Sequence, residues 1–248
     1  MAARDDIIGF LDELLDAPAW TDYGPNGLQV IGADEVDHVV TGVSAHRDLF
    51  ERAASAGAQL VLCHHGLFWK STPQVVGVQM KGRLKTLFDS DMSLAAYHLP
   101  LDAHPELGNN ALICAELGLE RGEQFASVGF VGRPPEPLAL DELVARCTRA
   151  FGGRAPLVLP GGADPVRTVG VISGGAASSL ADAAERGLDA MITGEPSEPA
   201  MADARETGVT LIAAGHYATE TFGVRALGEL VAQRFGVRHT FIDVPNPV

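Results

Sequence analysis

The sequence has few basic residues and no long apolar run. Lys and Arg number 18 against 32 Asp and Glu in 248 residues, which leaves a formal net charge of −14. Because negative charge repels phosphate backbones and anionic headgroups, this balance argues against direct binding of nucleic acid or of a membrane surface. No stretch approaches the roughly 20 apolar residues that cross a bilayer, and no apolar segment of a signal peptide follows Met1. We therefore expect a soluble cytoplasmic protein.

Cysteine is scarce as well. The three cysteines, Cys63, Cys114 and Cys147, lie far apart and form no CxxC pair. This spacing argues against a disulfide framework and against a zinc ribbon. A glycine-rich phosphate loop and a serine nucleophile elbow are also absent. The side chains that remain for chemistry are imidazoles and carboxylates.

A pattern of strand, helix and strand occurs in both halves of the chain. Residues 38–43 and 59–63 are strand-type apolar segments that flank a predicted helix at residues 47–55. The same order recurs at residues 168–193, without a gap, at an offset of 130. Gly57 aligns with Gly187, and each would end its helix with a left-handed cap.

A second match lies further along each half. Residues 94–102 align with residues 212–220 at an offset of 118, so that His98 matches His216 and Asp102 matches Glu220. Alternating strands and helices are typical of α/β proteins. We predict two structurally related α/β repeats with mixed sheets, at residues 1–122 and 123–248. We expect that they can intertwine and that they pack around a dinuclear metal site.

Imidazoles and carboxylates gather at the predicted strand ends. Ligand sites in open α/β sheets lie just beyond the carboxyl ends of the strands. The side chains at such ends here are His64, His65, His98, Asp102, Glu195, His216 and Glu220. Each alone is more often a satisfied polar residue than a ligand. Together they form the mixed ligand set of zinc, iron or manganese, and a carboxylate can bridge two such ions.

Other candidates are weaker. Trp69 and Lys70 follow the His pair, where they could contact a nucleotide or pack as a lid. His38, His46 and His239 have no neighbouring candidates, and we interpret them as structural. Cys63 is expected to be a small buried apolar residue.

Taken together, these motifs resemble the dinuclear-metal-centre family of GTP cyclohydrolase 1 type 2 homologues, in its short bacterial form. The resemblance spans nearly the whole chain. Its motifs are residues 22–30, 64–70, 83–87, 98–110, 193–195, 215–220 and 241–247. The longer relatives have an extra domain between the halves, and only about 45 residues lie there in this chain, so we expect no third domain.

The resemblance implies a ligand set and an assembly. The residues that match the family's metal ligands are His64, His65, Asp102, His216 and Glu220, and the last is expected to bridge two divalent ions. Relatives often have a second His at position 217, where this chain has Tyr217. Because the matching ligand is His216, this difference should change its surroundings only. The resemblance also implies a toroidal homohexamer whose sites face an inner cavity.

The resemblance further implies a metal-dependent hydrolase that opens the purine ring of a nucleotide such as GTP. His98 and Glu195, and more weakly His104, are the candidates for moving protons. Lys70, Arg83 and Lys85 could receive phosphates. The alternative is a non-enzymatic hexameric assembly with a metal-handling or regulatory role. These residues are equally consistent with that role. A scaffold for a DNA-linked partner is a third hypothesis, and the net charge argues against its direct contact with DNA.

Overall fold

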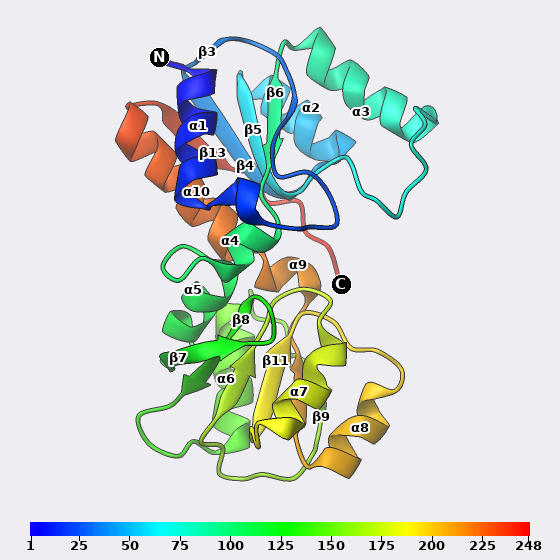
Figure 1. Ribbon diagram of the computed structural model, residues 1–248, viewed down its shortest axis with the longest axis vertical. Helices are drawn as coiled ribbons and strands as arrows, with labels where there is room; N and C mark the ends of the chain where they lie inside the picture. Colours follow the sequence, from blue (N-terminus) through cyan, green and yellow to red (C-terminus); the bar gives the residue numbers. More distant parts are fainter. The chain divides into compact units, whose positions relative to one another are not determined.

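The mixed α/β architecture predicted from the sequence is confirmed by the computed structural model, which describes residues 1–248 (Figure 1). Its contacts define two units. Unit 1 comprises Met1–Leu101 and Gly223–Val244, and unit 2 comprises Asp102–Phe222 and Pro245–Val248. The chain thus returns to unit 1 at Gly223–Val244, and its last four residues belong to unit 2 again. The division of the sequence into repeats after residue 122 stays a prediction.

Unit 1 is built on a five-stranded mixed sheet. Its order is β13-β4-β5-β6-β2, in which β2 alone is antiparallel to its neighbour. The strands are β2 (Gly27–Val30), β4 (His38–Ser44), β5 (Leu60–His65), β6 (Ser93–Ala96) and β13 (Arg238–Phe241). A small separate sheet pairs β1 (Ala2–Ala3) with β3 (Glu35–Val36).

Helices cover both faces of this sheet. Helices α1 and α10 lie on one side and α2 and α3 on the other (Figure 1). The helices of this part are α1 (Arg4–Leu14), η1 (Ala17–Ala19), α2 (Arg47–Ser55), α3 (Val78–Asp89) and most of α10 (Thr221–Phe235). Helix α1 buries Ile7, Ile8 and Leu11, and each such side chain contributes about 1.5–3 kcal/mol. It ends at Leu14, because Asp16 takes a left-handed conformation ahead of Pro18.

Unit 2 is built on a six-stranded mixed sheet of order β7-β8-β10-β11-β12-β9. The strands are β7 (Glu120–Phe125), β8 (Gly129–Arg133), β9 (Leu157–Leu159), β10 (Val169–Val171), β11 (Ala190–Thr193) and β12 (Thr210–Ala213). The helices are α5 (Asn109–Glu116), α6 (Leu140–Ala150), η2 (Ala177–Ser179), α7 (Leu180–Glu185), α8 (Ala200–Thr207) and α9 (His216–Thr219). The short helix α4 (Leu99–Ala103) spans the change from unit 1 to unit 2.

The predicted repeat is visible in the two sheets. Parallel strands β4, β5 and β6 correspond to parallel strands β10, β11 and β12, and each set has an antiparallel strand beside its last member. Gly57 and Gly187 both follow their helices with φ of 73° and 65°, the left-handed conformation expected at these positions. One difference concerns the site. His64 and His65 were expected just after a strand, and they lie inside β5 because His65 is in register with Ser44 of β4.

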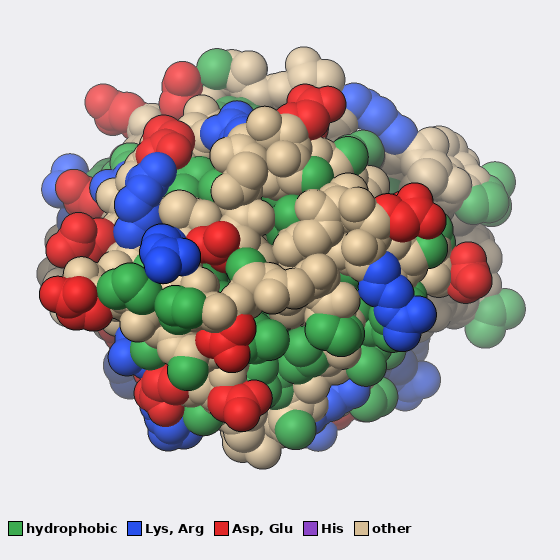
Figure 2. Space-filling view, turned by 90° about the horizontal axis from the view of Figure 1, so that it is seen from below, with side chains coloured by type: hydrophobic (Ala, Val, Ile, Leu, Met, Phe, Trp, Pro, Cys, Tyr) green, Lys and Arg blue, Asp and Glu red, His purple; other side chains and the backbone are tan.

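Each sheet has its own apolar core. In unit 2, side chains of α5, α6 and the central strands pack into one cluster around Ile113, Leu143 and Ile192. In unit 1, a comparable cluster gathers around Phe50, Val61 and Leu94. None of the helices combines the length and the apolar character needed to cross a membrane. On the face shown in Figure 2, acidic and basic side chains are interspersed, so the net charge of −14 does not form a single acidic patch there.

Candidate metal centre

Three histidines gather at the carboxyl ends of neighbouring strands in unit 1. His64 and His65 end β5, and His98 follows β6. One ligand nitrogen from each lies within 4.8 Å of the others. The ring centroid of His64 lies 4.7 Å from that of His65 and 5.0 Å from that of His98. Because β5 and β6 are parallel neighbours, their ends reach the same edge of the sheet, and this brings together side chains more than 30 residues apart.

His64 is held in a form suited to metal binding. Its Nδ1 lies 3.0 Å from the backbone carbonyl oxygen of Tyr97. A carbonyl only accepts hydrogen bonds, so Nδ1 carries the proton and Nε2 carries the lone pair. Such a contact fixes the tautomer and the orientation of metal-ligating histidines. His65 Nδ1 lies 3.1 Å from the Ser44 hydroxyl oxygen, which holds the ring but can either donate or accept.

Asp22 holds the third histidine, and it was missed by the sequence reasoning. His98 Nδ1 lies 2.7 Å from Asp22 Oδ1. The Asp22 carboxylate also accepts hydrogen bonds from the Asn26 amide and from the backbone N–H groups of Tyr23 and Leu99. Burial by itself raises the pKa of Asp22, but the hydrogen bonds from His98 and Asn26 outweigh it and hold the pKa at about 2. Asp22 is therefore ionised at neutral pH and keeps the proton of His98 on Nδ1.

The only sequence signal for Asp22 was its place at the start of the motif at residues 22–30. That motif contains turn-forming residues, and an Asp before a turn usually hydrogen-bonds to the backbone of the turn. Its partner lies 76 residues further along the chain. Residue spacing therefore could not have paired the two.

Asp102 is a buried carboxylate in unit 2. It is 4% exposed. Its Oδ1 accepts a hydrogen bond of 2.8 Å from the Asn109 amide and one of 3.1 Å from the Ser173 hydroxyl. A buried charge is costly unless polar partners or a cation compensate it. These two contacts fix the orientation of the carboxylate, as a ligand position requires.

His216, Glu220 and Glu195 form a second cluster in unit 2. Helix α9 begins directly after the β12 strand, and His216 is its first residue. His216 Nε2 lies 3.2 Å from Glu220 Oε1, and its Nδ1 lies 3.4 Å from Glu195 Oε1. The hydrogen bond with Glu220 raises the pKa of His216, although burial opposes it. Glu195, predicted to lie at a strand end, is thus placed beside His216.

Gly174 makes room for this second cluster. A Cβ at position 174 would stand 2.4 Å from Glu220 Oε1 and 3.4 Å from His216 Nε2. The residue also has a φ of +68°, which favours glycine. The Glu220 carboxylate therefore occupies space that any other residue at position 174 would fill.

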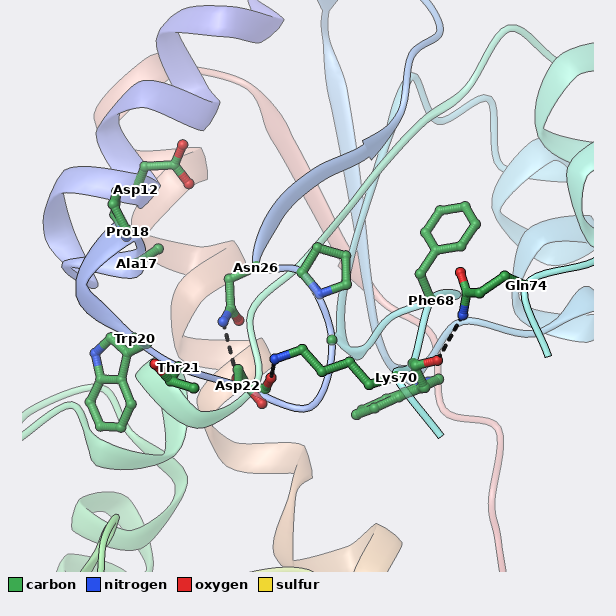
Figure 3. Close-up of a pocket in the computed structure, with 13 residues that line it drawn as sticks. Asp12, Ala17, Pro18, Trp20, Thr21, Asp22, Asn26, Phe68, Lys70 and Gln74 are labelled. Carbon is green, nitrogen blue, oxygen red and sulfur yellow. Dashed lines mark hydrogen bonds between the residues drawn. The ribbon is translucent and has the colours of Figure 1, made fainter. Parts of the chain in front are cut away.

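Trp69 packs against two of the three histidines, and Lys70 contacts the segment that carries Asp22. The Trp69 ring packs edge-on against His98, with centroids 5.1 Å apart, and against His65 at 5.7 Å. Lys70 Nζ donates a hydrogen bond of 2.6 Å to the backbone carbonyl oxygen of Asp22 (Figure 3). Arg83 and Lys85, also considered for phosphates, lie on α3, where Lys85 pairs with Asp89.

The remaining histidines make local structural contacts. His46 caps α2 by accepting a hydrogen bond from the Leu49 N–H, and His104 accepts one from the Leu107 N–H. His38 and His239 pair with threonine hydroxyls of neighbouring strands. Cys63 is buried, and burial raises the pKa of its thiol.

The fold and these side chains define a class: a repeated α/β protein with imidazole and carboxylate clusters at its strand ends, a donor set suited to divalent metals. The chain belongs to the Duf34/NIF3 (NGG1p interacting factor 3) family, whose model matches residues 2–247. This confirms the predicted family, because its relatives include proteins named GTP cyclohydrolase 1 type 2 homolog.

Two such relatives illustrate the likeness. The one from Pseudomonas aeruginosa is 46% identical over 252 residues, covering 99% of this chain and 98% of the relative. The one from Escherichia coli is 44% identical over 238 residues, covering 96% of each.

Solved structures agree with this. The structure of protein ybgI, described as of unknown function, superposes with a TM-score of 0.96 at 41% identity and covers all of both chains. A protein from Thermus thermophilus gives a TM-score of 0.93 at 37% identity, again over the full length of both chains.

Proposed function

We propose that five side chains hold two divalent metal ions, which are zinc, iron or manganese. The proposed ligands are His64, His65, Asp102, His216 and Glu220. The donor set supports this, since it combines imidazoles and buried carboxylates. The fixed tautomer of His64 and the fixed Asp102 carboxylate support it as well. Such ions, when bound, would supply Lewis acidity and a water of lowered pKa.

We further propose that the protein is a hydrolase that opens the purine ring of a nucleotide such as GTP. The observation that carries this proposal is the pair of Asp22 and His98 beside His64 and His65. Storing a metal needs ligands only, whereas hydrolysis also needs a positioned group that accepts a proton. Relatives named GTP cyclohydrolase 1 type 2 homolog point to the same reaction class.

In this proposal the chain's own residues move the protons. Hydrolytic ring opening adds water across a carbon–nitrogen bond: the oxygen bonds to carbon, and one proton reaches the leaving nitrogen. His98 Nε2 accepts a proton, because Asp22 keeps the other proton on Nδ1. Glu195, next to His216, is the second candidate for carrying a proton. Trp69 and Lys70 contact the substrate.

The test is to incubate metal-loaded protein with a panel of nucleotides that includes GTP and to measure the products by chromatography. We expect ring-opened product from the native protein and none from the double variant His65→Ala, Glu220→Ala. His98→Gln should keep its metal and lose about 100-fold or more in turnover, the usual contribution of a positioned acid or base.

The alternative is a non-enzymatic assembly that handles metal or regulates. Absence of product from every nucleotide by fully metal-loaded protein would overturn the hydrolase proposal and favour this alternative. Product that persists in the double variant would come from a contaminant, and would overturn it too.

We also propose that the chain assembles as a toroidal homohexamer, as the family resemblance implies. The expected native mass is six times 26.0 kDa, or about 156 kDa. Light scattering coupled to gel filtration measures it directly. A stable monomer or dimer at micromolar concentration would contradict the hexamer while leaving the proposed ligands untouched.

A further inference from the structure

A cavity of about 830 Å³ lies in unit 1 beside the three histidines. Two chain segments line it, residues 12–26 and 68–74 (Figure 3). Asp12 and Trp20 lie on one side, Phe68 and Gln74 on the other, and Asn26 between them. Its size falls within the usual range of sites for small molecules. Two of its lining residues, Asp22 and Trp69, directly contact His98.

Three aromatic side chains line the cavity. The sequence contains two tryptophans, Trp20 and Trp69, and both line this cavity together with Phe68. Trp69 is fixed in place, because its Nε1 donates a hydrogen bond of 3.1 Å to the Gly66 carbonyl oxygen. Indole rings offer flat faces on which planar heterocycles stack. In a chain with 6% aromatic residues, this grouping favours a flat ligand.

The polar groups of the cavity favour a ligand that donates hydrogen bonds. Asp12 Oδ1 accepts a hydrogen bond of 2.7 Å from the Tyr97 hydroxyl. Burial raises the pKa of Tyr97, so this hydroxyl stays a donor and fixes the Asp12 carboxylate. No protein donor lies within hydrogen-bonding distance of Asp12 Oδ2, which can therefore accept an N–H group from a ligand.

The charges of the cavity argue against a polyphosphate inside it. Its lining contains two carboxylates, Asp12 and Asp22, and one cation, Lys70. Lys70 donates to the Asp22 carbonyl oxygen, which ties it to the loop that carries Asp22. An uncharged ring with N–H groups suits these neighbours better than a polyanion does.

We propose that this cavity binds the heterocyclic base of a purine nucleoside or nucleotide, with the phosphates outside it. The base stacks on the indoles and donates N–H groups to Asp12. Lys70 then orders the Asp22 loop and does not receive phosphate. The inference rests on the proposed function, and it adds where the substrate's base is held, next to His98.

The test is binding without turnover. Guanosine, GTP and tripolyphosphate are titrated into the metal-free full-length protein, and tryptophan emission is followed. Because both tryptophans line the cavity, the emission reports on this site. We expect guanosine and GTP to change the emission with similar affinities, and tripolyphosphate to leave it unchanged.

Two variants locate the contacts, with guanosine binding measured by calorimetry. Trp20→Ala should weaken binding about tenfold, the usual effect of losing one stacking partner. Asp12→Asn should weaken it by a similar factor, because a charged acceptor is lost. The matched control is Asp16→Asn: residue 16 lies outside the cavity, and asparagine tolerates its φ of 47°.

The outcomes separate this inference from the proposed function. The assignment of the cavity is overturned if the native protein does not bind guanosine, or if Trp20→Ala and Asp12→Asn both bind it as tightly as the native protein does. Either result overturns it even if GTP is turned over. Guanosine binding that both variants weaken supports the assignment, even if the nucleotide panel yields no product.

Discussion

Replacing His64 with Ala is expected to remove bound metal from the protein. His64 lies fully buried at the end of β5, and its Nδ1 is held by the Tyr97 carbonyl oxygen, so that Nε2 is the atom that would bind metal in the proposed site. Removing a residue that only supports a ligand typically costs 10–100-fold in metal affinity. Loss of the ligand itself should cost more than about 100-fold. Elemental analysis after dialysis against a stated concentration of zinc measures this.

Thermal unfolding separates loss of metal from loss of fold. A ligand that binds only the folded state raises the unfolding midpoint. We therefore expect added zinc to raise the midpoint of the native protein and to leave that of His64→Ala unchanged, with both compared against their chelator-treated forms. The control is His46→Asn, which removes an imidazole outside the proposed ligand set and keeps a helix-capping acceptor. Full metal content in His64→Ala would remove His64 from the ligand set.

Replacing Gly174 with Ala is expected to destabilise unit 2 and to displace Glu220. Position 174 has a φ of +68°, and a side chain in this conformation costs about 1–2 kcal/mol. The added Cβ would also stand 2.4 Å from Glu220 Oε1, far closer than any ordinary contact. Because Glu220 is 3% exposed, its carboxylate has little space to move into. We expect a loss of both folding free energy and bound metal.

Gly187 provides a matched control for this substitution. Its φ of +65° is nearly the same, but no atom lies within 4 Å of its added Cβ. Gly187→Ala should therefore show the backbone cost alone, with unchanged metal content. Urea unfolding gives the free energies of both variants, and elemental analysis gives the metal. Equal destabilisation by the two substitutions, with metal retained in both, would show that Gly174 has no special relation to Glu220.

Much of the fold could be predicted from the sequence, because the signals are local. The pattern of residues 47–55 predicted a helix, and the structure shows α2 with the same bounds. The repeat predicted equivalent left-handed caps at Gly57 and Gly187, and both are observed. Helical period, turn residues and caps depend on neighbours within a few positions.

The sequence allowed the two repeats to intertwine, but it did not identify the segment that returns to unit 1. Strand β13 pairs with β4 although Arg238 and His38 lie 200 residues apart in the sequence. Such pairing depends on which sheet edge is exposed once the rest has folded, and no local pattern encodes that. The register that extends β5 through His65 was missed for the same reason.

The sequence by itself determined the order of the elements, the repeat and the imidazoles and carboxylates at the strand ends, because periodicity and turn chemistry act between near neighbours. Only the tertiary structure paired His98 with Asp22 and gathered Trp20 and Trp69 around one cavity. Those contacts join segments that are distant in the chain. They exist because β2 runs antiparallel to β6, so that the segment before β2 lies at the edge where β5 and β6 end, and because burial makes a carboxylate retain its hydrogen-bond partners.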